Sequence, residues 1–180
     1  MRSRCYVAVL VLVLVGSIFP KKCLALPITV GYQASDLGGG HWKYIYDVRN
    51  DSFSEPIQEF TIWFDRAKYR TLQVATPNPP AADWDELVVQ PDPILHDDGF
   101  YDARALGAGI LVGSQETGFV VQFDWLGSGG PGRQPFDIVN PITLQVEYSG
   151  MTVPEPSAWI LLAGGIAAAR RWRVRRGLRR

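Results

Sequence analysis

The sequence predicts an all-β fold, most simply an antiparallel β-sandwich. Apolar and polar side chains alternate along many short segments, and Gly, Pro, Asn or Asp interrupts the alternation roughly every eight to twelve residues. No stretch of about ten residues between positions 28 and 150 shows the helical spacing of apolar residues. About eight strands at this spacing are typical of an immunoglobulin- or fibronectin-like sandwich, and a jelly roll is the alternative.

The clearest strand candidates are 42–49, 57–64 and 142–148. In the first, Tyr44 and Tyr46 share one face while Lys43 lies on the other, as in a half-buried strand. Further candidates are 28–33, 71–75, 86–90, 109–113 and 118–125. The intervening segment 76–99 holds five prolines, so we expect a long surface loop with at most one strand in it.

The N-terminus has the three parts of a secretory signal peptide. Two arginines precede the apolar run 6–15, and Cys23-Leu24-Ala25 supplies a small-residue pattern, so signal peptidase is expected to cut after Ala25. An uncleaved anchor is the alternative, because two lysines just before such a site are atypical. Both cysteines lie in residues 1–25, so the mature protein would have neither a disulfide nor a cysteine nucleophile.

Residues 26–150 remain as one extracytoplasmic domain of ordinary size. They carry seven basic and 17 acidic side chains, a net charge of −10, because the other basic residues lie in the two termini. An acidic body disfavours nucleic acid and anionic lipid as partners.

The C-terminus combines a Pro-Glu-Pro motif, a short apolar segment and a basic tail. The motif consists of Val153, Pro154, Glu155, Pro156 and Ser157. Its prolines favour an extended, accessible chain. The apolar segment 158–169 is expected to form a transmembrane helix, and the arginines beyond it orient the body outside the cytoplasm. These arginines are Arg170, Arg171, Arg173, Arg175, Arg176, Arg179 and Arg180.

This order of motif, apolar segment and basic tail resembles the PEP-CTERM sorting signal of Gram-negative bacteria. The membrane enzyme exosortase, which is similar to transpeptidases, recognises and processes that signal. The resemblance covers residues 153–180. It implies export, transient anchoring in the inner membrane and processing near the motif, in organisms that commonly make exopolysaccharide and biofilm.

The apolar segment is short for a membrane span. Counted from Ser157 to Ala169, a helix of about 13 residues is on the order of 20 Å long, against a hydrocarbon core of about 30 Å. Such a marginal anchor suits a signal that a processing enzyme handles. A stable single-pass anchor is the alternative.

A second resemblance lies at residues 118–138. Three of its residues, Phe119, Val121 and Phe123, are expected to face the core, and the glycines of 127–132 allow a turn. The stretch is similar to a Trp-Leu-Gly-x-Gly-x-Pro-Gly-x-Gln-Pro-Phe block of PEP-CTERM ectodomains. In those proteins the block ends a β-rich domain of unassigned activity. We interpret it as a structural turn with a buried Trp125.

Acidic residues gather around Gly99. Closely spaced aspartates on a tight turn can supply the oxygen ligands that calcium needs, although the spacing is not that of an EF-hand. Solvated loop acids explain the pattern equally well, so calcium is the one cofactor considered. The candidate ligands are Asp92, Asp97, Asp98 and Asp102.

Aromatic residues suggest a carbohydrate platform. Exposed aromatic rings can stack on the apolar faces of sugars. Trp63 alternates with the apolar residues of its segment and is expected on the outer face, and Trp84 lies between two aspartates of the predicted loop. Together with Tyr101 they form the candidate glycan-binding set.

The chemistry of the chain does not point to an enzyme. Only two histidines are present, His41 and His96, in no metal-ligand spacing, and no GxSxG nucleophile motif occurs. We therefore expect an exported cell-surface or matrix protein with a structural or adhesive, non-catalytic role beside exopolysaccharide. A calcium-dependent or aromatic carbohydrate-binding module and a secreted hydrolase are the alternatives.

Overall fold

The computed structural model describes residues 26–78 and 80–155, and these residues form strands and loops. Within these two ranges no helix is long and apolar enough to cross a membrane. The predicted signal peptide, the segment 158–169 and the arginine tail lie outside the described residues. The strands are β1 (Ile28–Gly38), β2 (His41–Asn50), β3 (Glu59–Phe64), β4 (Tyr69–Val74), β5 (Trp84–Val89), β6 (Gly99–Ala105), β7 (Gln115–Trp125), β8 (Pro135–Val139), β9 (Val146–Met151) and β10 (Val153–Pro154).

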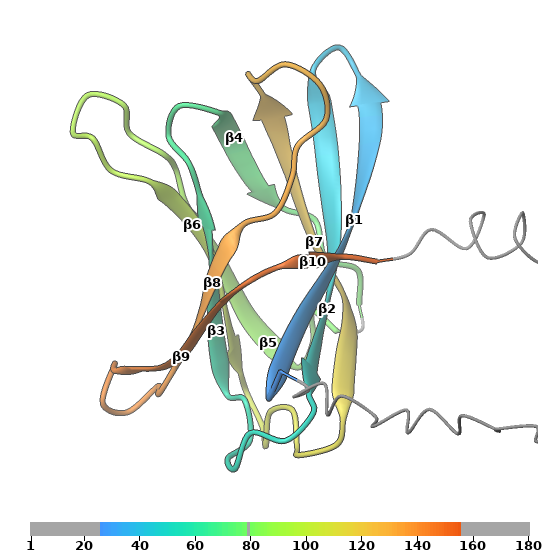
Figure 1. Cartoon of the computed structure of the whole chain (residues 1–180), viewed down its shortest axis with the longest axis vertical. Coiled ribbons are helices and arrows are strands. Elements are labelled where there is room, and N and C mark those ends of the chain that lie inside the picture. The colour runs from blue at the N-terminus through green and yellow to red at the C-terminus, as the bar shows by residue number, and fades with distance from the viewer. Residues whose placement is uncertain (1–25, 79, 156–180) are drawn as a thin grey trace, which may run out of the picture.

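The strands form two five-stranded sheets that face each other (Figure 1). One sheet has the order β10-β1-β2-β7-β4 and the other β5-β6-β3-β8-β9. Neighbouring strands are antiparallel except for β10, which pairs with β1 in parallel. The predicted all-β fold, with two facing sheets as in a β-sandwich, is confirmed.

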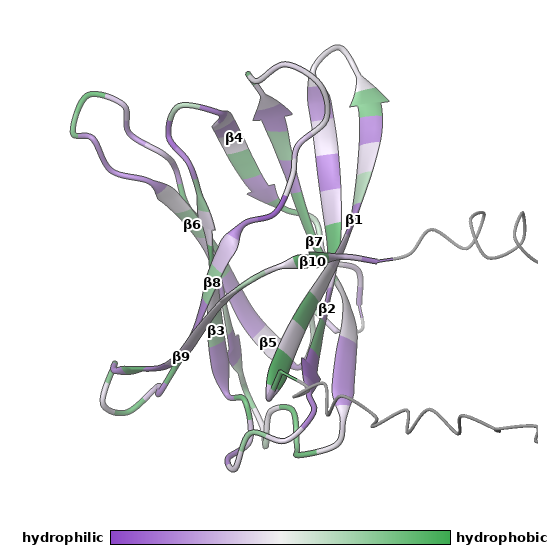
Figure 2. Ribbon diagram, viewed as in Figure 1, coloured by the Kyte–Doolittle hydropathy of each residue, from purple (hydrophilic) through white to green (hydrophobic). Residues whose placement is uncertain are grey.

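The period-two pattern places the apolar face of each sheet inside, and bands of hydrophobic and hydrophilic residues alternate along several strands in Figure 2. In β2, Tyr44, Tyr46 and Val48 are buried, as their alternation predicts. In β7, Phe119 and Phe123 are buried in the same way.

Two strand predictions are wrong where the structure has loops. The segment 109–113 forms no strand and contributes only a bridge between Ile110 and Ile57. Residues 142–145 form a turn instead of the start of a strand, because the Asn140 side-chain oxygen accepts the backbone N–H groups of residues 142 and 143. Leu144 has a φ of 56°, far from the negative φ of a regular extended strand. The strands β6 and β8 were not predicted at all.

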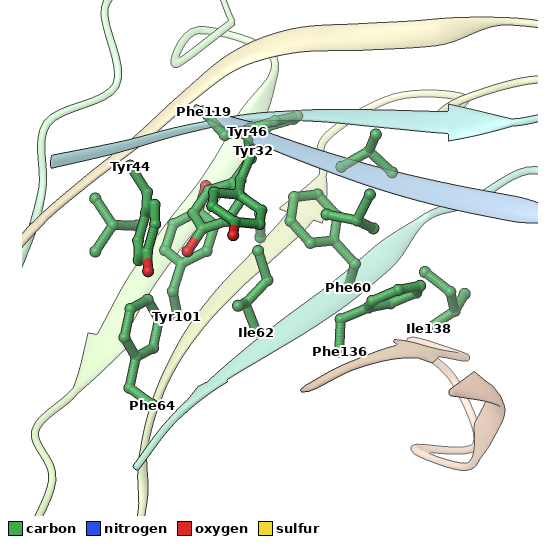
Figure 3. Packing of buried hydrophobic residues seen from close by; sticks show 14 of the residues in the cluster. Tyr32, Tyr44, Tyr46, Phe60, Ile62, Phe64, Tyr101, Phe119, Phe136 and Ile138 are labelled. Atoms are coloured by element: carbon green, nitrogen blue, oxygen red, sulfur yellow. The ribbon is translucent and has the colours of Figure 1, made fainter. Parts of the chain in front are cut away.

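Aromatic rings from both sheets fill the core (Figure 3). Phe119 of β7 packs edge-to-face on Phe60 of β3, with ring centroids 5.0 Å apart. At the other end of the core, Phe64 packs on Tyr69 of β4 at 5.1 Å. Such pairs add to the hydrophobic gain of burying each ring, so they hold the two sheets in one alignment.

Tyrosine hydroxyls bring polar groups into this core. The Tyr44 hydroxyl donates to the Gly132 carbonyl at 2.7 Å and so ties β2 to the loop between β7 and β8. The Tyr46 hydroxyl is buried and finds no hydrogen-bond partner among the described residues. Burial strongly raises the pKa of Tyr46, so this hydroxyl stays neutral.

The contrast between these two tyrosines gives a stability prediction. Tyr46→Phe removes an unpaired buried hydroxyl, so its free energy of unfolding should be unchanged or higher by about 1 kcal/mol. Tyr44→Phe leaves the Gly132 carbonyl without its donor and should lower that free energy by about 1–2 kcal/mol. Urea denaturation of both variants measures the difference. Equal losses in the two variants would contradict the hydrogen-bonding described for them.

Candidate functional site

Of the three predicted glycan-binding residues, only Trp63 lies on the outside. Trp84 is 6% exposed and Tyr101 is 0% exposed, and both belong to the hydrophobic core. The predicted exposure of Trp84 is wrong, because alternation along β5 turns Trp84, Glu86 and Val88 inward. Trp63 has the outward orientation that its alternation predicted and is partly buried.

Trp63 lies in a row of apolar side chains that runs across the outer face of its sheet. It is paired with Phe100 of β6, and Phe100 is paired with Val89 of β5. The ring centroids of Trp63 and Phe100 are 5.4 Å apart and the rings are inclined by 59°. We call this row, with the neighbouring exposed Leu87, the Trp63 surface.

Hydrogen-bonded carboxylates border the Trp63 surface. The Trp63 Nε1–H donates to Asp137 Oδ2 at 2.8 Å, and Ser149 Oγ donates to the other oxygen of Asp137 at 2.6 Å. Asp102 accepts a hydrogen bond of 2.6 Å from Thr61. Burial raises the pKa of Asp102, and the Thr61 hydrogen bond and the charge of Arg104 oppose that rise. The outer face thus offers an indole with a fixed orientation beside ordered acceptors.

A pocket of about 580 Å³ continues from Trp63 to the end of the sandwich that is drawn at the top of Figure 1. Its walls come from the turn after β3, the start of β6 and the loop between β7 and β8. Acidic, basic and aromatic groups therefore converge at one end of the molecule. They are Trp63, Asp65, Lys68, Tyr69, Asp98, Trp125 and Arg133.

The glycine-rich stretch after Trp125 has a structural role, as interpreted from the sequence. The Trp125 Nε1–H donates to the Gly129 carbonyl at 2.8 Å. A Cβ on Gly127 would lie 2.4 Å from the Trp125 ring, so a larger residue would have to displace the indole. Trp125 also packs on Tyr69 at 4.9 Å, but it is only partly buried, whereas the sequence predicted a buried side chain. This loop forms one wall of the pocket beside Trp63.

The four predicted calcium ligands do not converge. Among residues 26–78 and 80–155, no group of three or more acidic or histidine side chains is placed to hold a metal ion. Asp92 accepts the backbone N–H groups of residues 94 and 95 at a turn, and those bonds lower its pKa. Asp98 pairs with Arg66 at 3.1 Å, and Asp102 accepts from Thr61. Asp97 takes part in the same turn through a backbone bridge with Asp92.

The first half of the C-terminal motif is part of the fold. Val153 and Pro154 form β10 and pair with Gly31 and Tyr32 of β1, and the Glu155 N–H donates to the Tyr32 carbonyl at 2.9 Å. The chain is extended there, as the prolines predicted. It is held against the edge of a sheet, whereas the sequence predicted a freely accessible segment. Pro156, Ser157 and the cleavage residue Ala25 lie outside the described residues.

Two acidic side chains meet beside this strand. The Glu155 carboxylate accepts a hydrogen bond from the Gln33 amide. Burial, then the hydrogen bond and charge of Glu155, raise the pKa of Asp47 to about 7. The hydrogen bonds from Asp47 and Gln33 lower the pKa of Glu155. Because one pKa rises and the other falls, Asp47 holds its proton to a higher pH than Glu155 does. Sequence reasoning missed this pair, because Asp47 and Glu155 lie more than a hundred positions apart in the chain.

A scan of protein-family models and a search of curated proteins found no match. Among solved structures, the chain is similar to the GH20 exo-β-N-acetylglucosaminidase from Vibrio harveyi in complex with N-acetylglucosamine, with a TM-score of 0.38 and 12% identity. An inactive mutant of that enzyme gives a TM-score of 0.39. Both likenesses cover 73% of this chain and only 18% of the enzyme. A chain of the CaDoc0917–CaCohA2 complex gives a TM-score of 0.35 at 11% identity, over 71% of this chain and all of that one.

Proposed function

We propose that this chain is an exported bacterial surface protein that is sorted through its C-terminal motif and has a structural or adhesive, non-catalytic role. Signal peptidase would remove residues 1–25, and exosortase would act on the motif while segment 158–169 holds the chain in the inner membrane. The body of the protein would then lie outside the cytoplasm, in the cell envelope or beyond it.

The order of segments at the C-terminus is the observation that carries this proposal. The last strand of the fold ends at Pro154, inside the motif, and the apolar segment begins only a few residues later. The seven arginines follow at once. In the sequence, almost no linker separates the folded acidic body from the proposed membrane segment, which suits a domain delivered to a membrane enzyme.

The test follows the mass of the protein in a Gram-negative host with and without exosortase. Wild-type protein should lose its arginine tail only when exosortase is present. Pro156→Ala should slow that loss at least about tenfold, because it alters the motif outside β10. Pro93→Ala, at an exposed turn, is the matched control and should be processed normally. Retention of the full-length tail in both hosts would contradict the sorting proposal.

A second candidate function is binding of a neutral or basic sugar polymer at the Trp63 surface. The specific observation is that a hydrogen bond to Asp137 fixes the Trp63 indole beside Phe100. Trp63 also lines the pocket. Its ring offers a stacking face, and the bordering carboxylates offer acceptors for sugar hydroxyls. The pocket also holds Lys68 and Arg133, so both acceptors and donors are in reach of a ligand.

Affinity electrophoresis of the mature protein in gels that contain the host's exopolysaccharide tests this binding. Trp63→Ala should weaken binding about tenfold, equivalent to about 1.4 kcal/mol, and Trp63→Phe should retain most of it. Val146→Ala, at an exposed position of β9, is the matched control. A chelator should have no effect, because the four aspartates do not form one site. Unchanged binding by Trp63→Ala at unchanged melting temperature would refute the surface.

A further inference from the structure

The edge of β1 forms a clasp for the chain's own C-terminal motif. We propose that Gln33, Asp47 and the backbone of β1 hold Val153–Glu155 against the fold in a proton-dependent way, and that the processing enzyme engages the motif only when this clasp opens. The clasp itself rests on contacts within the described residues. Its role as a gate rests on the proposed sorting function.

The backbone part of the clasp is short. β10 has two residues in register with β1, and Pro154 has no N–H group to donate. The hydrogen bond from the Glu155 N–H to the Tyr32 carbonyl is therefore a large share of the backbone pairing. A two-residue parallel pairing at a sheet edge is marginal, so the side chains decide whether β10 stays docked.

Gly31 leaves room for the side-chain contacts of the clasp, because it has no side chain of its own. Gly31 is paired with Asp47 on one side and with Val153 on the other. A Cβ on Gly31 would lie 2.0 Å from Asp47 Oδ1, so the Asp47 carboxyl lies directly over the glycine and reaches toward β10. Glu155 follows two residues after Val153 along the same edge, Gln33 holds it there, and its hydrogen bond and charge act on Asp47. The side chains of Gln33 and Asp47 thus act on Glu155. The backbone of β1 pairs with the two residues of β10 that precede Glu155.

The contacts require that the Asp47–Glu155 pair hold a proton. Two ionised carboxylates in contact repel each other, whereas a neutral acid donates a strong hydrogen bond to a carboxylate. Asp47 Oδ1 is buried and has no hydrogen-bond partner among the described residues, which also disfavours its ionised form. The docked state therefore binds this proton more tightly than the open state.

The pKa of Asp47 sets how docking of β10 depends on pH. The pKa of Asp47 is about 7 when β10 is docked, and it should return toward its ordinary value when Glu155 leaves. Docking then weakens as the pH rises through about 7, because the proton on Asp47 is lost there. The other charged group that acts on Asp47 is Arg49, on the same strand, which lowers the pKa and is itself paired with Asp51. On β7, Asp47 is paired with the uncharged Thr117.

The chain just before β10 limits how far the clasp can open. Thr152 is fully buried, and its N–H donates to the Gln134 carbonyl at 2.8 Å. Opening therefore frees residues 153–155 and stops at Thr152. In the sequence, residues 156 and 157 alone stand between the last described residue and segment 158–169, and opening adds residues 153–155 to that connection. An enzyme that must surround an extended motif gains access only in the open state.

Hydrogen exchange of the full chain in detergent micelles tests the clasp without exosortase. The amides of Val153 and Glu155 report opening, and the Thr152 amide is the internal reference. After correction for the intrinsic rate, protection of the two amides should fall about tenfold between pH 6 and pH 8 while that of Thr152 stays constant. Constant protection of all three would overturn the proton dependence.

Three variants sharpen this test. Asp47→Asn keeps a neutral donor at all pH values, so its protection should not change between pH 6 and pH 8. Gly31→Ala should displace Asp47 and leave residues 153–155 unprotected throughout, with a melting temperature that shows the fold is retained. Asp36→Asn, at the exposed far end of β1, is the matched control and should behave as wild type. A wild-type pH response in Asp47→Asn would overturn the clasp.

Processing in the exosortase-bearing host then tests the gate. Release should be several-fold faster for Gly31→Ala than for wild type, and it should be independent of pH for Asp47→Asn. If the exchange results are as expected but all variants are processed at equal rates, the clasp exists and does not control processing. That result would refute the gate. If no variant is processed at all, the sorting proposal fails, and the exchange measurements still decide the clasp.

Discussion

The hydrogen-bonded pair of Gln134 and Thr152 is the constraint on which the rest of the structure depends. The two side chains are 1% and 0% exposed. The Gln134 N–H donates to Thr152 Oγ1 and the Thr152 N–H donates to the Gln134 carbonyl, both at 2.8 Å. The Gln134 amide also donates to the Tyr69 hydroxyl at 3.0 Å. Buried polar groups are costly unless they are paired, so this geometry is strongly favoured over alternatives that leave any of them unpaired.

Both candidate surfaces rely on this pair. Gln134 ends the glycine-rich loop that forms one wall of the pocket beside Trp63. Thr152 fixes the chain one residue before β10, so it sets where the motif meets β1. The proposed binding surface and the proposed clasp therefore lie at the two ends of one buried network. A disturbance of the network should reach the Trp63 pocket and the C-terminal motif together.

The sequence predicted the fold class because alternation in strands such as β2 and β3 is local. It could not predict the inward face of β5, because Glu86 points into the core there. That orientation is tolerated because the Thr76 and Tyr101 hydroxyls both donate to Glu86, and neither partner is a neighbour in sequence. The aspartates near Gly99 are close in sequence, yet they have separate partners. The pairing of β10 with β1 joins residues more than a hundred positions apart, a contact that no local pattern indicates.

A double-mutant cycle on the full chain tests the central claim, that the Gln134–Thr152 pair acts as one unit. Gln134→Leu, Thr152→Val and the double variant are compared with wild type by denaturant unfolding. The account predicts that each single variant lowers the free energy of unfolding by about 2–3 kcal/mol. Gln134→Leu removes the acceptor of the buried Thr152 hydroxyl, which donates to Gln134 Oε1 at 3.2 Å, and Thr152→Val removes the acceptor of the buried Gln134 N–H. The double variant should be more stable than the sum of the two losses implies, with a coupling of about 1 kcal/mol or more. Losses that simply add would contradict the account.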